Sequence, residues 1–110
     1  MNKKLIVIIL MSLPWFATAN SGGTGWRNIT SLGCHLTDGT CYFNIDGAPV
    51  GAESCTNNNV RFDVLNSPNG KTWLSLLQQA YASKTRVSLN INACYGNSNY
   101  PTFNYGAIEK

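Results

Sequence analysis

Four cysteines in a short polar chain constrain this fold more than any other feature. Cys34 and Cys41 flank residues 37–40, whose central Asp-Gly pair is a strong turn signal. A hairpin at that turn would bring the two cysteines together, so we expect them to form a bridge. Cys55 then pairs with Cys94, which is one of the three arrangements that four cysteines allow. That bridge would close a loop of about 40 residues and contribute about 4 kcal/mol through loop entropy. No zinc-binding spacing is present, so we expect four structural cysteines and no metal site.

The amino-terminal segment has the pattern of a cleavable export signal. A basic start at residues 2–4 is followed by an apolar run at residues 5–16 and by small residues at 17–19. We therefore expect cleavage after residue 19 and a secreted or periplasmic domain at residues 20–110, in a compartment where disulfides persist. The apolar run is short for a membrane span, and no later segment approaches the necessary length, so no membrane span is expected.

Composition indicates one small domain with a nearly neutral surface. Removing residues 1–19 from the 110-residue chain leaves 91 residues, which suits a single domain. Lys3 and Lys4 leave with the signal, so the net charge falls from +3 to about +1. No basic stripe is visible, which argues against a nucleic-acid partner. Asparagine is abundant instead, and such a surface forms hydrogen bonds through amides rather than through ions.

Alternation of apolar and polar residues predicts five strands, and apolar residues three and four apart predict one helix. Ser67 is a good N-cap, and Pro68 suits the first helical position. We expect residues 20–25 to be a flexible lead-in and residues 47–59 to be a loop. The expected strands span residues 26–34, with a bulge or bend, 41–45, 60–64, 85–92 and 103–107, and the expected helix spans 68–83.

The resulting order is strand, strand, strand, helix, strand, strand. This is the element order of an OB-fold, a five-stranded, partly open Greek-key barrel. We therefore expect an α+β domain, mainly β with one helix, of OB-fold-like type. A small α+β meander with the helix laid on one sheet face is the alternative. The last strand is expected at a sheet edge, because Pro101 is tolerated at the start of such a strand.

Catalytic groups are sparse in this sequence. His35 is the single histidine, and it lies beside Cys34 in the predicted hairpin. The G-x-S-x-G elbow of hydrolases is missing, and the five acids are scattered rather than paired. We therefore expect no enzyme, no catalytic residue and no cofactor.

Asparagine and aromatic residues favour binding over catalysis. Asparagine amides both donate and accept hydrogen bonds, and aromatic rings offer flat apolar faces with polar tips. Amides for hydroxyls and rings for sugar faces are what a shallow neutral-glycan site needs. The rings considered for this role are Trp26, Tyr95, Tyr100 and Tyr105.

Several segments of the chain resemble a known family. Residues 29–47 are similar to the opening hairpin of the B subunits of subtilase-, typhoid- and pertussis-like toxins, where an Ile-Thr start leads through a turn to a Tyr-Phe-x-Ile segment. Residues 53–55 resemble the small residue and cysteine that follow that hairpin. Residues 76–89 resemble the family's helix and next strand, and residues 100–103 resemble its Tyr-Pro-x-Phe motif. The same layout is similar to a related family of small exported bacterial proteins of unknown function.

The resemblance implies an OB-fold, a ring of five subunits with helices around the pore, a catalytic A subunit as partner, and binding of sialylated or related glycans. The chain departs from the family at the sialic-acid site. Residues 21–25 lack the acidic and aromatic residues that contact sialic acid in the toxins, and Ile91 stands where a tyrosine helps there. Cys34 and Cys41 are additions to the family pattern. The resemblance therefore supports an OB-fold for this chain more strongly than it supports a sialic-acid site.

Together, these observations predict an exported, non-catalytic glycan-binding domain that resembles a toxin B subunit and forms oligomers. The alternative is a secreted or periplasmic accessory module that recognises a protein through the same sheet face. A helix face with small, uncharged residues permits contact between helices in an oligomer. That face holds Thr72, Ser75, Gln79 and Ala82. The expected glycan contacts are Thr24, Trp26, Asn92, Tyr95 and Tyr100.

Overall fold

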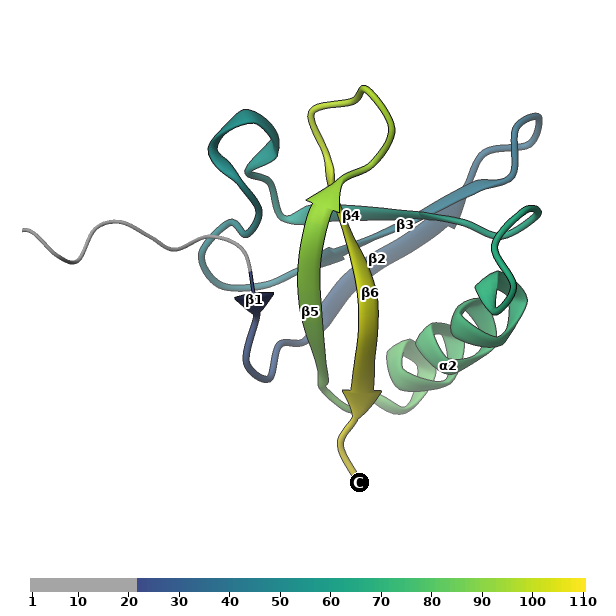
Figure 1. Ribbon diagram of the computed structural model, residues 1–110. Coiled ribbons are helices and arrows are strands. Elements are labelled where there is room, and N and C mark those ends of the chain that lie inside the picture. Colours follow the sequence, from purple (N-terminus) through teal and green to yellow (C-terminus); the bar gives the residue numbers. More distant parts are fainter. Residues whose placement is uncertain (1–21) are drawn as a thin grey trace, which may run out of the picture.

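The computed structural model describes residues 22–110 (Figure 1). The expected export signal at residues 1–19, and the expected start of the domain at Asn20, lie outside these residues. Within the described part of the chain, no helix is long and apolar enough to cross a membrane.

Among the described residues, two antiparallel three-stranded sheets and one α-helix make up the fold, which confirms the expected α+β class, mainly β with one helix. The elements are β1 (Gly22–Gly23), β2 (Ile29–Cys34), β3 (Thr40–Ile45), the 3-10 turn η2 (Glu53–Cys55), β4 (Asn59–Asp63), α2 (Gly70–Ser83), β5 (Val87–Cys94) and β6 (Pro101–Ile108). One sheet has the order β1-β5-β6 and the other has the order β2-β3-β4. Figure 1 shows β5 and β6 crossing in front of the β2-β3-β4 sheet.

The expected five-stranded OB-fold-like barrel is wrong, because the strands do not close into one sheet. β6 ends one sheet and β4 ends the other, and no ladder joins them within the described residues. Side chains bridge this seam instead: the rings of Phe62 and Phe103 contact edge to face, with centroids 5.7 Å apart. The edge position expected for the last strand is confirmed.

The order of elements also differs from the expected one, because the short strand β1 precedes the others. Gly22 and Gly23, which were expected in a flexible lead-in, pair with Ile91 and Asn90 of β5. Glycine has no side chain, so a strand made of glycine shows no alternation in the sequence. This strand gives β5 a partner on the side away from β6.

Alternating residues of both sheets form one hydrophobic core with α2. Phe43 is fully buried, and its ring contacts those of Phe62 and Phe103 edge to face. Trp73 of α2 packs against Phe103 with ring centroids 5.0 Å apart. The buried core residues are Ile29, Cys41, Phe43, Ile45, Val50, Val60, Phe62, Leu77, Ala80, Val87, Leu89 and Ile91. The two sheets and the helix therefore pack around one shared core.

The helix begins at Gly70, two residues later than expected. The N–H of Gly70 donates to the carbonyl of Ser67 at 3.2 Å, so Ser67 and Pro68 belong to a turn before the helix. Asn69 is the N-cap, without a side-chain cap bond. A Cβ at Gly70 would collide with the carbonyl oxygen of Asp63 at the end of β4. Packing therefore requires glycine here, although glycine is a weak helix former.

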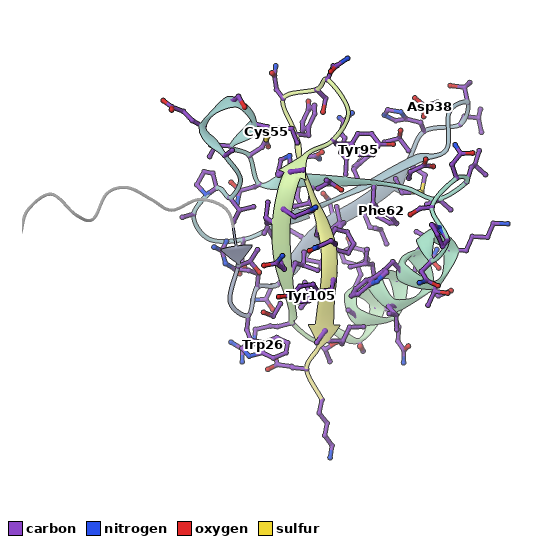
Figure 2. The ribbon with its side chains drawn as sticks, in the orientation of Figure 1. Trp26, Asp38, Cys55, Phe62, Tyr95 and Tyr105 are labelled. Atoms are coloured by element: carbon purple, nitrogen blue, oxygen red, sulfur yellow. A yellow bond between two sulfur atoms is a disulfide. The ribbon has the colours of Figure 1, made fainter. Side chains whose placement is uncertain are left out.

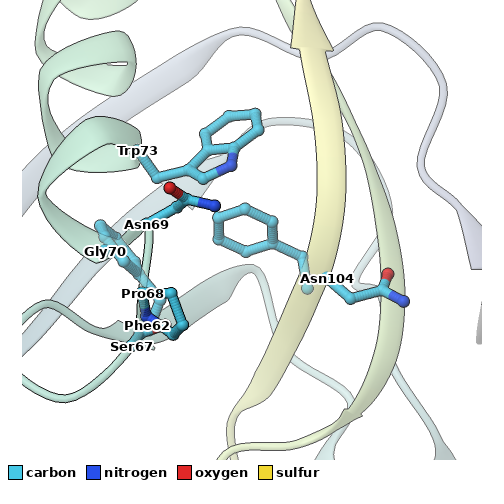
Figure 3. Close-up of a pocket in the computed structure, with 8 residues that line it drawn as sticks. Phe62, Ser67, Pro68, Asn69, Gly70, Trp73 and Asn104 are labelled. Atoms are coloured by element: carbon cyan, nitrogen blue, oxygen red, sulfur yellow. The ribbon is translucent and has the colours of Figure 1, made fainter.

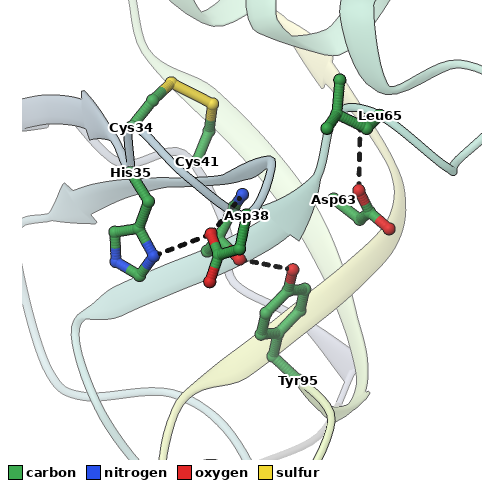
Figure 4. Close-up of a disulfide and its surroundings, with 8 residues drawn as sticks. Cys34, His35, Asp38, Cys41, Asp63, Leu65 and Tyr95 are labelled. Atoms are coloured by element: carbon green, nitrogen blue, oxygen red, sulfur yellow. Dashed lines mark hydrogen bonds and ion pairs between the residues drawn. A yellow bond between two sulfur atoms is a disulfide. The ribbon is translucent and has the colours of Figure 1, made fainter.

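Both expected disulfides are confirmed. Cys34 and Cys41 bond to each other and face each other in the β2–β3 register (Figure 4). Cys55 bonds to Cys94 and so ties η2 to the end of β5. The bulge expected in the first long strand is also present, as a register shift within β2.

Candidate functional site

The outer face of the β1-β5-β6 sheet presents polar side chains to solvent. In β5, Val87, Leu89 and Ile91 are buried in the core. Ser88 and Asn90 alternate with them and are only half buried, so they point away from the core. This alternation decides which side chains of β5 a ligand can reach.

Strand pairing places Tyr105 on the same outer face. Asn90 is paired with Tyr105 of β6 on one side and with Gly23 of β1 on the other. Ser88 is paired with Ala107. Because residues opposite each other in antiparallel strands share a face, Tyr105 lies beside Asn90. Gly23 and Ala107 have little or no side chain, so they do not fill the space beside Asn90 and Ser88 on this face.

A groove of about 380 Å³ lies over this face, between two exposed aromatic rings. Trp26 is 45% exposed and Tyr105 is 63% exposed, and Figure 2 labels both in the lower half of the view, near the C-terminal part of β6. The remaining lining residues are Gly23, Ser88, Leu89, Asn90, Gly106 and Ala107. None of these lining residues carries a charge.

Backbone hydrogen bonds on both sides of Trp26 fix its position beside the sheet. The N–H of Thr24 donates to the carbonyl of Leu89 at 2.9 Å, and the N–H of Leu89 donates to the Thr24 hydroxyl at 3.0 Å. Beyond Trp26, Arg27 and Val87 exchange two backbone hydrogen bonds of 2.8 Å each. The exposed ring of Trp26 is therefore presented by an anchored segment rather than by a free loop.

The floor of the groove is polar but neutral. Asn90 Nδ2 donates to Asn104 Oδ1 at 2.7 Å, which leaves the Asn90 amide oxygen able to accept a further hydrogen bond. Beyond Ser88, Arg86 donates to both carboxylate oxygens of Glu109 at 2.6 and 2.9 Å. These hydrogen bonds lower the pKa of Glu109 below its usual value. The ion pair is therefore satisfied internally.

Of the expected glycan contacts, only Trp26 lines the groove. Thr24 is buried beneath it: its hydroxyl donates to the carbonyl of Gly25 at 2.8 Å and accepts from the N–H of Leu89. Asn92 is exposed on β5, in the stretch where the β5–β6 register shifts, and is not among the lining residues. Thr24 thus positions the segment that carries Trp26.

Tyr95 lies at the other end of β5, away from Trp26 (Figure 2), and its N–H donates to the carbonyl of Tyr100 at 2.8 Å. The hydroxyl of Tyr95 is 2.8 Å from the hydroxyl of Thr40, as Figure 4 shows. The ring of Tyr100 is covered by the guanidinium group of Arg61, which lies 3.6 Å from the ring centroid. These two tyrosines therefore join the loop after β5 to the β2-β3-β4 sheet.

Tyr105, Ser88 and Asn90 complete the groove. Tyr105 is one of the rings that suit a glycan site by the sequence, but none of the three is among the expected contacts. Alternation already places Ser88 and Asn90 on one face of their strand, and Tyr105 is an aromatic residue of the last strand. The link between them is the register of β5 and β6, which shifts twice after Asn90. A pattern within one strand does not reveal such a register.

A second cavity, of about 360 Å³, lies at the start of α2 (Figure 3). Trp73 and Phe103 pack against each other in its wall, and Asn69 and Asn104 also line it. The two rings are half buried and belong to the aromatic cluster of the core, so they offer less free surface than the rings of the groove. A third cavity, of about 340 Å³, lies between the end of α2 and the start of β2.

The histidine and the one aspartate of the β2–β3 turn close that turn. His35 Nδ1 lies 3.0 Å from Asp38 Oδ1, as Figure 4 shows. The N–H of Thr40 donates to the same oxygen at 3.1 Å and is the main reason that the pKa of Asp38 is lowered. No group of His, Cys, Asp and Glu among residues 22–110 could hold a metal ion.

The groove, the cavity at α2 and the β2–β3 turn each bring aromatic, amide or ionisable side chains together. Within the described residues, the groove is the one that combines two exposed rings with an uncharged polar floor. Comparison of the chain with protein-family models, with curated proteins and with solved structures finds no match.

Proposed function

We propose that this protein is an exported, non-catalytic glycan-binding domain whose site is the groove between Trp26 and Tyr105. The observation that carries the proposal is the pair of exposed rings on either side of an uncharged floor with Ser88 and Asn90. The rings supply flat apolar surface for the C–H face of a sugar, and the floor supplies partners for its hydroxyls. Export is supported by the pattern of residues 1–19 and by the two disulfides.

The neutral lining favours a neutral saccharide. Arg86 lies close to the groove, but its Nε and Nη2 atoms already donate to the carboxylate of Glu109. A carboxylate-bearing sugar, such as the sialylated glycans implied by the toxin resemblance, would have to compete with Glu109 for this arginine. Neutral oligosaccharides are therefore the ligand class that this groove suits best.

Such a groove binds each glycan weakly. Each net hydrogen bond contributes about 1 kcal/mol, and each stacked ring contributes a similar amount. A sum of about 4 kcal/mol corresponds to a Kd of about 1 mM. Several grooves in one oligomer would raise the effective affinity about 100-fold or more. Glycan binding and oligomer formation thus support each other in this proposal.

A glycan array with the folded, oxidised protein tests the proposed site. We expect retention of at least one neutral oligosaccharide, and a loss of about tenfold or more, equal to about 1.4 kcal/mol, for Trp26→Ala and for Tyr105→Ala. Tyr81→Ala is the matched control, because Tyr81 is also 45% exposed but lies on α2, outside the groove. An array on which the folded wild-type protein retains nothing contradicts the proposal, as does an equal loss in the control.

The resemblance to toxin B subunits supports a ring of five subunits and a catalytic A subunit as further parts of the proposal. The helix face with Thr72, Ser75, Gln79 and Ala82 is exposed and uncharged, which permits contact between neighbouring helices. Light scattering on the purified domain measures the oligomer directly. A mass of five subunits is expected, and a monomer at high protein concentration contradicts the ring.

A protein-interaction or accessory module is the second candidate function, and the tip of the β2–β3 hairpin favours it. Leu36 is fully exposed there, and Leu65 of a neighbouring loop is 64% exposed. The bridge between Cys34 and Cys41 holds the tip, so little conformational entropy would be lost on binding. This candidate predicts a stoichiometric protein partner. The substitution Leu36→Ser is expected to abolish binding of that partner, and the control Thr37→Ser is expected to leave binding unchanged. Equal capture by Leu36→Ser and wild type removes the hairpin tip from consideration.

A further inference from the structure

Two of the chain's three arginines have the ends of their guanidinium groups paired. Arg27 Nη1 donates to the backbone carbonyls of Asp46 and Ala48 at 2.6 and 2.9 Å. Arg86 donates through Nε and Nη2 to both carboxylate oxygens of Glu109. In each case at least one terminal Nη atom has a hydrogen-bonding partner within the fold.

Arg61 is different, because only its Nε has a partner among the described residues. Nε donates to Asn59 Oδ1 at 3.1 Å, and no described residue accepts a hydrogen bond or forms an ion pair with its Nη groups. Asp63 follows two residues later on the same strand face, but its Oδ1 accepts the N–H groups of Leu65 and Asn66 at 3.0 and 3.1 Å. Among residues 22–110, the Nη groups of Arg61 therefore have no hydrogen-bonding partner, which leaves them available for an anion.

Aromatic rings hold this guanidinium group where it is. The Cζ atom of Arg61 lies 3.6 Å from the ring centroid of Tyr100 and 5.6 Å from that of Tyr42, distances typical of cation–π contacts. Tyr42 lies opposite Arg61 in the β3–β4 register. The loop that carries Tyr100 is held by the hydrogen bond between Tyr95 and Thr40. The guanidinium group is thus held by two rings, with no acidic counter-ion in the described part of the chain.

We infer that Arg61 is the centre of an oxyanion-binding site on the outer face of the β2-β3-β4 sheet, where its two Nη groups take a carboxylate, sulfate or phosphate group. The guanidinium fork matches such groups with two parallel hydrogen bonds. Much of the ordering entropy of the long side chain has already been spent in the stack with Tyr42 and Tyr100. The site lies on the other sheet from the groove, so it stands independently of the proposed glycan binding.

Titration of the ¹⁵N-labelled protein, followed by NMR, tests this site with sodium sulfate, phosphate and acetate, and with sodium chloride at matched ionic strength as reference. We expect a saturable shift of the Arg61 Nε–H and Asn59 side-chain signals, with a Kd of about 1 mM or tighter, as a bidentate charge-assisted contact allows. Stronger binding of acetate identifies a carboxylate ligand, and stronger binding of sulfate or phosphate identifies a sulfated or phosphorylated one.

Two variants distinguish bidentate hydrogen bonding by the guanidinium group from a simple effect of positive charge. Arg61→Lys keeps the positive charge but loses the planar fork, and we expect about tenfold weaker binding. Lys71→Gln removes one exposed charge elsewhere and is expected to change the Kd less than about twofold, since exposed charges are screened.

Equal Kd values for Arg61→Lys and wild type overturn the inference, and so do shifts that chloride reproduces. If Arg61→Lys melts at a much lower temperature than wild type, its Kd is not interpretable, and the titration of the wild-type protein alone tests the site. In that case, the absence of a saturable shift at the Arg61 Nε–H overturns the site. Glycan binding in the groove is unaffected by any of these outcomes.

Discussion

At Gly70 the first turn of α2 lies directly against the end of β4. A Cβ on this residue would collide with the carbonyl oxygen of Asp63 and lie 2.7 Å from the Cα of Val64. We therefore predict that Gly70→Ala destabilises the protein by about 1–3 kcal/mol, as overpacking does, even though alanine favours helix. Urea denaturation measures the change, with Lys71→Ala as a neighbouring exposed control that stays within about 0.5 kcal/mol. A more stable Gly70→Ala variant would show that the helix start can move.

The carboxylate of Asp46 joins two chain segments and makes stability depend on pH. It accepts the side-chain amide of Asn28 at 3.0 Å and the N–H of the same residue at 2.8 Å, and these bonds lower the pKa of Asp46. A carboxyl whose pKa is lower in the folded state contributes stability above its unfolded pKa of about 4 and loses it as the pH falls through the folded value.

Asp46→Asn is therefore predicted to melt at a lower temperature than wild type at pH 6, because asparagine carries no charge to stabilise these hydrogen bonds. The difference is expected to shrink as the pH is lowered from 6 towards 2, because the wild-type carboxyl loses its charge as it takes up a proton. Melting curves across this range measure the effect. Two parallel curves, with a constant difference at every pH, would contradict this role for Asp46.

Among the elements, the two disulfides differ in the length of chain that they close. Cys55 and Cys94 are 39 residues apart, whereas Cys34 and Cys41 are 7 apart and already face each other in the sheet. Loop entropy then predicts that replacing Cys55 and Cys94 by alanine lowers the free energy of unfolding by about 1.5 kcal/mol more than replacing the other pair. Urea denaturation of the two double variants provides the measurement. Equal losses would mean that local strain or denatured-state structure outweighs loop length.

Elements with clear periodicity are predictable from this sequence, and those without it are not. Strands β3 and β4 and the body of α2 follow patterns of alternation or of three-and-four spacing, and the structure confirms them. Strand β1 consists of Gly22 and Gly23, which show no pattern. The helix start is displaced because Gly70 is required by a contact with β4, which is distant in the sequence. Local patterns predict local structure, and these two departures come from contacts between elements.

At the scale of the whole molecule, contacts between distant elements also explain why the sequence does not predict the arrangement of the sheets or the full set of groove residues. The order of elements suggests a partly open OB-fold-like barrel, but such a barrel depends on pairing between β4 and β6, and aromatic side chains bridge that seam instead. Trp26 is predictable as an aromatic contact, whereas its grouping with Tyr105, Ser88 and Asn90 depends on a shifted β5–β6 register. Tyr95 and Tyr100 have the right chemistry for a glycan, but the fold uses them to join the two sheets.

The indole N–H signals of the protein test the central proposal most directly. Within the described residues there are two tryptophans: Trp26 lies at the groove and Trp73 at the cavity beside α2. In a ¹⁵N NMR titration with the neutral oligosaccharide that binds best on the array, we predict a saturable shift of the Trp26 indole signal together with the backbone amides of Ser88, Asn90 and Tyr105. The Trp73 indole signal is expected to stay in place. A shift of Trp73 with Trp26 unchanged, or no shift of either signal, would contradict glycan binding in the groove.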